Sequence, residues 1–558
     1  MTETLAPPRS TLPGRTWGRM RRPTLWTVLA LAVVAVILLP IVTVLSRVFV
    51  PSEGVWPHLV ATVLPIYLGN TLILVAGVTT LAVVIGLTTG WLVAACDFPG
   101  RRVFEWALML PMAMPAYVIA YVYFDRLSFW GPIQTGLRQA FGWGRGDYLF
   151  PQIASLPGAT VLLALVLYPY VYLLARAAFL GQSQHLMEAA RALGHSRTSA
   201  FFRVALPMAW PAIAAGAAFV AMETLADYGA VLHLGVQTLT TGIFRTWFAR
   251  GAPVAAAQLS ALLVGFVAAA FLVERLVRGS RRFAGDAGGR SATLTRVRLG
   301  PGGAALAAMA CALPVTLGFL FPAAELVRLA VIAGDPLWGP RFLAFATNSL
   351  TMAAGAAALL VGLAVFLGYA RRLQGGPVIS AAMQAASLGY AMPGAVIAVG
   401  VLIPLAAFDN ALDGVLRANF GISTGLLLTG TIAALMFAYV VRYLAVALKT
   451  VDAGFARIPR SMDEAARNLG AGPGGLLLRV HVPLLRRGML TAAIFVFADV
   501  MKELPATLIV RPFNFDTLAI RTFRLASDGR LEEASTAALM IVAVGVLPVI
   551  LLSRAMNR

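Results

Sequence analysis

Long apolar runs are the feature of this chain that most restricts how it can fold. The first of them, TLWTVLALAVVAVILLPIVTVLS, extends from Thr24 to Ser46 and contains no charged residue. A helix needs about 20 such residues to cross a bilayer. Of all 558 residues, 59% are hydrophobic and 12% are charged, a composition too apolar for a soluble globular protein. We therefore predict an all-α polytopic membrane protein in a lipid bilayer.

Twelve apolar runs predict about twelve transmembrane helices. Arginine-rich loops such as FPGRR and ARRLQGGP occur at alternate connections. Because loops of this kind remain on the cytoplasmic side, both termini are predicted to be cytoplasmic. The same topology explains the net charge of +20, so no nucleic acid is expected as a partner. The predicted spans lie near residues 24–46, 68–95, 104–124, 157–180, 208–232, 254–276, 303–332, 346–370, 378–406, 422–448, 486–510 and 533–553.

The chain is predicted to consist of two homologous halves. Residues 278–303 are rich in Gly, Ser and Arg, lack a helical apolar period, and are predicted to be a cytoplasmic linker. They separate a first half, 24–277, from a second half, 304–558, and residues 1–23 are a cytoplasmic tail. Two like halves indicate a pseudo-two-fold axis with a path available between them. The recurring motifs are Asn70-Thr-Leu with Asn348-Ser-Leu, AMPAYVIA from Ala113 with AMPGAVIA from Ala391, and Thr238-Leu with Thr517-Leu.

One charged segment also occurs twice. EAARALGHSRTSAFFRVALP begins at Glu188, and EAARNLGAGPGGLLLRVHVP begins at Glu464. Gly194 and Gly470 stand where a helix end requires a left-handed residue. Two ordinary amphipathic helices on the membrane surface are the simpler interpretation. The shared Gly and Pro spacing instead favours two docking helices, because their small Ala side chains permit close approach of a partner.

The two segments resemble the Glu-Ala-Ala loop of bacterial ABC importer permeases, Glu-Ala-Ala-x3-Gly-x9-Ile-x-Leu-Pro. Val204 and Val480 occupy the Ile position, and Val482 replaces Leu in the second copy. The resemblance implies that each loop is a coupling helix on a separate ATP-binding subunit, two copies of which are expected. The coupling residues it implies are Glu188, Ala189, Ala190, Gly194, Glu464, Ala465, Ala466 and Gly470.

Two longer segments resemble the iron(III) permeases, in which two permease domains are fused. They are MKELPATLIVRPFNFDTLAIRTF from Met501 and ETLADYGAVLHLGVQTLTTGIFRTWF from Glu223. This resemblance implies a bacterial inner-membrane subunit that imports iron(III) delivered by a periplasmic substrate-binding protein. Related permeases of the same architecture carry thiamine, polyamines, phosphonates or sulfate, so these substrates remain alternatives.

The chain is not expected to be an enzyme. A phosphate-binding loop needs Gly before Lys, but the two lysines, Lys449 and Lys502, follow Leu448 and Met501. No cofactor is therefore expected in this chain, and ATP and Mg are expected on the partner subunit. A secondary transporter driven by an ion gradient is the rival class, although it has no need for two matched docking helices. The two cysteines suggest neither a disulfide framework nor a zinc site, and metal ligands cannot be assigned.

Charges and prolines within the spans mark a candidate translocation path. Ionisable residues in a membrane tend to face the bundle interior or an aqueous path. They can instead form purely structural pairs, and Lys502 is expected to have Asp499 or Glu503 as its partner. Pro115 and Pro393 interrupt helical hydrogen bonding, either as simple kinks or as helix breaks beside the path. The candidate path or gate residues are Glu223, Asp227, Asp499, Lys502 and Glu503.

The predicted topology can be tested by cysteine labelling. Single cysteines at Gly288 and Gly142, introduced after replacement of Cys96 and Cys311, should react with an impermeant maleimide from opposite sides of the membrane. Intact and inverted vesicles provide the two sides. Labelling of both positions from the same side would contradict the twelve-span arrangement.

Overall fold

The computed structural model describes residues 25–52, 54–182, 190, 192–278, 296–333 and 339–556. The described part is almost entirely helical, and its one sheet joins two strands of two residues, β1 (Cys96–Asp97) and β2 (Val297–Arg298). The helices of the first half are α1 (Leu25–Ser46), α2 (Val55–Thr62), α3 (Leu64–Ala95), α4 (Arg101–Ala107), α5 (Ala116–Leu127), α6 (Pro132–Phe141), α7 (Leu156–Leu180), α9 (Arg197–Ala200), α10 (Leu206–Ala226), α11 (Gly229–His233), α12 (Leu239–Phe244) and α13 (Pro253–Arg278). Those of the second half are α14 (Pro301–Val315), α15 (Phe321–Ala333), α16 (Pro340–Gln374), α17 (Pro377–Ala386), α18 (Gly394–Phe420), α19 (Ile432–Ala456), α20 (Arg460–Asn468), α21 (Pro473–Leu476), α22 (Val482–Met501), α23 (Pro505–Val510), α24 (Leu518–Ser527) and α25 (Leu531–Met556).

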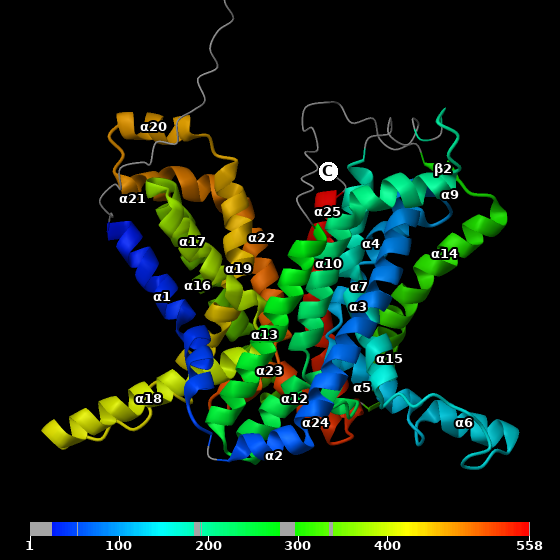
Figure 1. Cartoon of the computed structure of the whole chain (residues 1–558), viewed down its shortest axis with the longest axis horizontal. Helices are drawn as coiled ribbons and strands as arrows, with labels where there is room; N and C mark the ends of the chain where they lie inside the picture. Colours follow the sequence, from blue (N-terminus) through cyan, green and yellow to red (C-terminus); the bar gives the residue numbers. More distant parts are fainter. Residues whose placement is uncertain are drawn as a thin grey trace, which may run out of the picture.

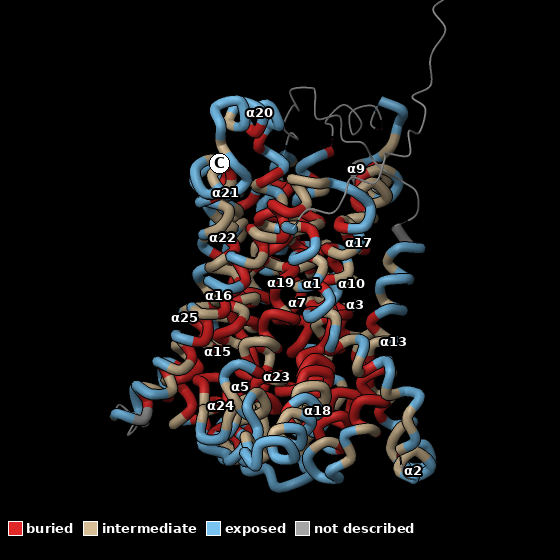
Figure 2. The backbone as a smooth tube through the Cα atoms, turned by 90° about the vertical axis from the view of Figure 1, so that its left-hand side faces the viewer, coloured by how far each residue is buried: buried red, intermediate tan, exposed pale blue. Residues whose placement is uncertain are grey.

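The long helices run between two ends of one bundle (Figure 1). The end that carries α9, α20 and β2 is called the loop end here, and the end that carries α2, α6 and α24 is called the far end. Helix α1 begins and α25 finishes at the loop end, so the described chain starts and stops on the same side. Figure 2 shows buried residues concentrated along the axis between these ends.

The two halves interlock through their first helices. Helix α1 of the first half packs against α17 and α18 of the second half. Reciprocally, α14 and α15 pack against α3, α4 and α5 of the first half. Gly400 permits the α1–α18 crossing, because a Cβ there would lie 2.5 Å from the Pro40 carbonyl oxygen. Such close approach through small residues is typical of helices packed in membranes.

Ten described helices are long and apolar enough to cross a membrane, or eleven if one bent pair is counted as a span. Four of the twelve predicted spans are interrupted, including the one near 208–232, which breaks between α10 and α11. The span near 104–124 bends by 89° between Ala113 and Ala116. The span near 378–406 breaks between Ala391 and Gly394, and the one near 486–510 breaks between α22 and α23. Apolar content predicts that such a segment lies in the membrane, but it does not show whether the helix is continuous.

A matching polar contact holds one loop in each half. The side-chain amide of Asn70 donates to the Gln237 carbonyl at 2.9 Å, and that of Asn348 donates to the Asp516 carbonyl at 3.1 Å. The next residues, Thr71 and Ser349, accept from the backbone N–H groups of Leu239 and Leu518. The repeated Asn motif therefore fixes the starts of α12 and α24, where Thr238 and Thr517 are the N-caps.

Candidate translocation cavity and coupling loops

A cavity of about 140 Å³ lies between the two halves. Helices α5, α7, α10, α19, α22 and α23 contribute to its wall. This volume accommodates several water molecules. All five candidate path residues and Pro115 line it, so the structure brings together side chains more than 270 positions apart in the sequence. The lining charges predicted from the sequence are Glu223, Asp227, Asp499, Lys502 and Glu503.

Two of these acids cap short helices at equivalent breaks. Helix α10 ends before Asp227, whose carboxylate accepts from the Val231 backbone N–H at 3.0 Å. Helix α22 ends before Glu503, whose carboxylate accepts from the backbone N–H groups of Ala506 and Thr507, each at 2.9 Å. The N–H groups at a helix start have no partner within their own helix, so a buried carboxylate satisfies them. Asp227 and Glu503 therefore have a structural role at the cavity wall.

The other two acids differ in their partners. Asp499 forms an ion pair with Lys502, with 3.0 Å between Oδ1 and Nζ. Asp499 is thus the partner expected for Lys502. The equivalent acid in the first half, Glu223, is half-buried, and within the described ranges no hydrogen bond or ion pair reaches its carboxylate. Glu223 consequently remains available to an occupant of the cavity.

Arg442 is a cavity residue that the sequence analysis missed. It lies in the middle of α19, with 3.6 Å between one guanidinium nitrogen and Glu503 Oε1. Gly394 makes room for it, because a Cβ at that position would lie 2.1 Å from the same guanidinium group. A charge within the apolar run ALMFAYVVRYLAVAL was the available signal. The position that matches Arg442 in the first half is Val166, which also lines the cavity.

The cavity wall is therefore asymmetric in charge. Both cations, Arg442 and Lys502, come from the second half, where the first half has Val166 and Ala226. Four carboxylates surround them, and five tyrosines complete the polar part of the wall. Tyr117 is only 5% exposed, and its hydroxyl has no hydrogen-bond partner in the part of the chain that the structure describes. The tyrosines are Tyr117, Tyr170, Tyr228, Tyr390 and Tyr443.

Pro115 and Pro393 interrupt their helices completely. Each is the N-cap of the following helix, with ψ of 138° at Pro115 and 142° at Pro393, so the backbone is extended there. A 3₁₀ turn precedes each break, at Leu110–Ala113 and Ser387–Ala391. The simple-kink interpretation is therefore wrong, because the chain leaves the helix and starts a new one. The first break places Met114 and Tyr117 at the cavity.

The two Glu-Ala-Ala loops are described to different extents. In the first, Glu188 and Ala189 lie outside the described residues, whereas Ala190 is buried. In the second, α20 exposes Glu464 and Ala465 and partly buries Ala466. Gly194 and Gly470 both have the left-handed conformation expected from the sequence, with φ of +86° and +82°. The preceding residues, Leu193 and Leu469, are 81% and 89% exposed.

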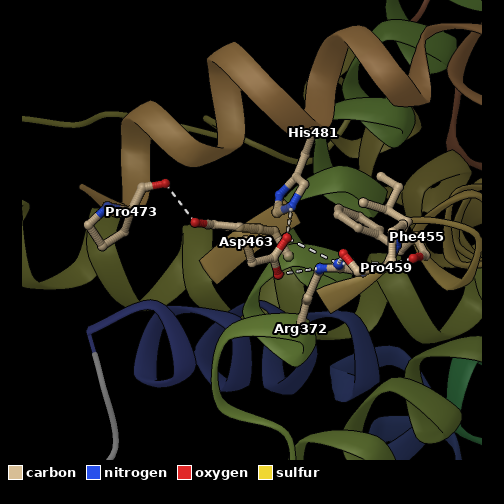
Figure 3. Close-up of polar contacts among 8 residues, drawn as sticks. Arg372, Phe455, Pro459, Asp463, Pro473 and His481 are labelled. Carbon is tan, nitrogen blue, oxygen red and sulfur yellow. Dashed lines mark hydrogen bonds and ion pairs between the residues drawn. The ribbon is translucent and has the colours of Figure 1, made fainter. Parts of the chain in front are cut away.

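A buried polar cluster anchors the second loop (Figure 3). The Asp463 carboxylate accepts from Arg372 Nε at 2.7 Å and lies 2.9 Å from His481 Nε2. The Arg372 guanidinium also donates to the Phe455 and Ile458 carbonyls, each at 2.8 Å. Burial alone raises the pKa of Asp463, but the hydrogen bonds from Arg372 and His481 outweigh it and hold that pKa below its usual range. Asp463 is therefore ionised at neutral pH.

This cluster connects the second Glu-Ala-Ala loop to the cavity wall. Arg372 belongs to α16, and His481 immediately precedes α22, which continues to Lys502 at the cavity. The residue of the first half that matches His481 is Ala205, which cannot make an equivalent contact. Its backbone carbonyl instead accepts from Gln182 at 2.8 Å. The cluster could not be predicted from the sequence, because its three residues lie in separate segments.

Metal-ligand geometry is not evident in the described ranges. No group of three or more His, Cys, Asp or Glu side chains within them could hold a metal ion. The two cysteines, Cys96 and Cys311, are buried thiols. The cavity therefore offers carboxylate and phenol oxygens without a preformed metal centre among the described side chains.

Comparison with known proteins gives one repeated family match. Residues 82–282 and 360–558 each match the family described as binding-protein-dependent transport system inner membrane component. The Fe(3+)-transport system permease protein FbpB 2 of Haemophilus influenzae is 25% identical over 508 residues, which cover 87% of this chain and 89% of that protein. The molybdenum transport system permease protein ModB of Escherichia coli is 28% identical over 219 residues, or 37% of this chain and 93% of ModB. A putative 2-aminoethylphosphonate transport system permease protein, PhnV of Salmonella typhimurium, is 29% identical over 171 residues, or 31% of this chain and 58% of PhnV.

The Lys502–Asp499 pair gives a testable prediction for the cavity. Lys502→Met leaves Asp499 unpaired and should destabilise the protein by about 1–2 kcal/mol, since the pair is only partly buried. Adding Asp499→Asn should restore the amount of protein in the membrane, measured by immunoblot. If the pair also acts in transport, uptake by the double variant should remain well below that of the wild type. Full recovery of uptake together with protein level would show that the pair is structural alone.

Proposed function

Because this chain belongs to the family of binding-protein-dependent transport system inner membrane components, with the family domain present twice, we propose that it is the permease of an iron(III) ABC importer. In this proposal both halves form the translocation path, and hydrolysis of ATP by separate subunits drives import. The observation that carries the choice of iron is the similarity to an Fe(3+)-transport permease over 87% of this chain. Such coverage includes the linker between the halves, whereas the molybdenum and phosphonate relatives each match about a third of the chain.

The chemistry of the cavity supports a cationic substrate. Four carboxylates face two cations there, so the wall is acidic when all six groups are ionised. Arg442 and Lys502 are already paired with Glu503 and Asp499, which leaves Glu223 as the acid without a protein partner in the described ranges. Hard cations prefer carboxylate and other oxygen ligands. We assign the Glu223 carboxylate and the unpartnered Tyr117 hydroxyl as the groups that contact the passing ion transiently.

The loop end is proposed to face the cytoplasm and to bind two copies of an ATP-binding subunit. Each copy docks on one Glu-Ala-Ala loop, with the exposed Leu193 or Leu469 directed to the partner. ATP and Mg are bound by that subunit, and no cofactor is assigned to this chain. A periplasmic substrate-binding protein delivers the ion to the far end. This arrangement puts the protein in a bacterial inner membrane, with both termini in the cytoplasm.

The two coupling loops are proposed to contribute unequally. Helix α20 is fixed to α16 and to the start of α22 by Asp463, Arg372 and His481. Displacement of α20 therefore displaces α22, and with it the Asp499–Lys502 pair at the cavity. The first loop lacks the matching histidine, so its displacement is less directly connected to α10. The second loop is the one through which most of the conformational change enters.

Reconstitution tests the proposed function. Vesicles with this chain, its ATP-binding subunit and iron(III)-loaded binding protein should accumulate iron only when ATP is present. The uptake should persist after an ionophore collapses the ion gradients. Loss of uptake on collapse, with no requirement for the ATP-binding subunit, would identify a secondary transporter instead. ATP-driven uptake of molybdate, a phosphonate, a polyamine or thiamine but not iron would retain the importer and reject iron(III).

Glycine substitution tests the coupling loops. Gly470→Val imposes a β-branched residue on a left-handed position, at a strain of about 1–2 kcal/mol, and should lower the iron transported per ATP about tenfold. Gly194→Val should give a smaller defect, because its loop lacks the Asp463 anchor. Gly472→Val is the matched control, since Gly472 has φ of −70° and open space around its Cα. Wild-type coupling in both the Gly194 and Gly470 variants, at normal protein levels, would refute the role of the loops.

A further inference from the structure

A second cavity, of about 490 Å³, lies at the loop end, away from the translocation cavity. Two segments about 200 positions apart form it: the turn between β1 and α4 with the first residues of α4, and the strand β2 near the end of the predicted linker. The strands pair in parallel, with Asp97 opposite Arg298, so the end of the linker is fixed to the first half. Four arginines line this cavity beside a single carboxylate, that of Asp97. They are Arg101, Arg102, Arg296 and Arg298.

Most of this positive charge has no counter-charge. Arg101 lies 3.9 Å from Asp97 and 3.6 Å from Glu105, so it is partly neutralised. The other three arginines are exposed, and in the described part of the chain no carboxylate lies within ion-pair distance of them. Like charges gathered around one cavity repel each other, so an anion bound between them stabilises the arrangement.

The loop-end terminus of α16, the second-half helix that corresponds to α3, carries arginines whose charge is neutralised. Arg371 pairs with Asp452 at 2.7 Å, and Arg372 pairs with Asp463 at 2.7 Å. Both arginines are thus neutralised by carboxylates of the chain itself. A general preference for arginine on the cytoplasmic side explains charge at both places, but it does not explain why Arg102, Arg296 and Arg298 remain without carboxylate partners around one open cavity.

We propose that this cavity is a binding site for a phosphate group. Guanidinium groups bind phosphate oxygens through paired N–H donors, and several arginines around one cavity suit a group with more than one negative charge or oxygen. The cavity lies beside the loop-end termini of α3 and α14. The headgroup of an anionic phospholipid can reach such a position, and basic pockets at this depth are suited to these headgroups. Inorganic phosphate is the other source of the same chemistry.

A bound phosphate would join the first half to the end of the linker, close to the start of α14. Arg102 belongs to the first half, whereas Arg296 and Arg298 lie near the end of the predicted linker. An anion held by both segments strengthens the two-residue strand pairing between β1 and β2, which has few hydrogen bonds of its own. The phosphate site does not involve the transported ion, so the test of this site is independent of the test of iron(III) as the substrate.

Thermal unfolding of the full-length protein in detergent tests this site. Added phosphatidylglycerol or inorganic phosphate should raise the melting temperature, and phosphatidylcholine should not. At about 1 kcal/mol for each arginine, Arg102→Gln/Arg298→Gln should raise the ligand concentration for half of the effect about 30-fold. Arg457→Gln/Arg479→Gln is the matched control, because it removes two exposed arginines elsewhere at the loop end. The control should respond like the wild type.

The outcomes of this experiment distinguish the two sources of the phosphate group and show which results would contradict the site. Stabilisation by phosphatidylglycerol alone assigns a lipid headgroup, and stabilisation by inorganic phosphate alone assigns a soluble anion. If the double glutamine variant folds poorly, Arg102→Lys/Arg298→Lys retains the charge and should keep most of the response. The site would be overturned if phosphatidylglycerol or phosphate raised the melting temperature of the double glutamine variant as much as that of the wild type. It would also be overturned if the control variant lost as much of this response as the double glutamine variant, or if phosphatidylcholine stabilised the wild type equally.

Discussion

Helix breaks inside a membrane must satisfy their own backbone groups, and the centre of this protein depends on that constraint. Hydrocarbon supplies no water to a free N–H, so each break needs a polar partner within the protein. Asp227 and Glu503 meet this need at matching positions, 276 residues apart. Their presence explains why ionisable residues persist in apolar segments. It also fixes where α11 and α23 start, and hence the position of the cavity wall.

The carboxylates that satisfy these breaks create a second electrostatic problem. A buried carboxylate without an opposite charge is unfavourable, and the second half supplies cations where the first half does not. Arg442 lies beside Glu503 and Lys502 beside Asp499, whereas Asp227 and Glu223 have no cation within ion-pair distance in the described ranges. One wall is therefore internally neutralised, and the other remains acidic. An acidic wall that faces a neutralised one attracts a cation without holding it between two acidic surfaces.

The sequence was most informative where a feature repeats. Recurrence of Asn70 as Asn348, and of Thr238 as Thr517, identified equivalent positions, and the structure gives them equivalent hydrogen bonds. Features present in one half only were harder to predict. The Arg372–Asp463–His481 cluster joins three separate segments, and the sequence marks Arg442 as a charge in an apolar run without indicating its contact with Glu503. Helix continuity was equally inaccessible, because apolar content is the same on both sides of Pro115 and Pro393. Packing, rather than local composition, decides whether a proline bends a helix or ends it.

Fusion of the two halves gives a physical reason for this asymmetry. Separate copies of one permease subunit would pair as identical halves, so a charge introduced on one wall would also occur on the other. In a single chain each half occurs once, and Arg442 can face Val166 while Lys502 faces the first-half wall that has Ala226. The same freedom extends to the loop end, where the arginines at the end of α16 pair with carboxylates of α19 and α20, whereas most arginines around the second cavity have no such partner. The interlocked first helices keep the unlike halves in one register, because α1 and α14 each pack on the opposite half. The sequence difference between the halves therefore depends on this packing. If α1 and α14 did not pack on the opposite half, two cavity walls of unequal charge would lack a fixed relative position.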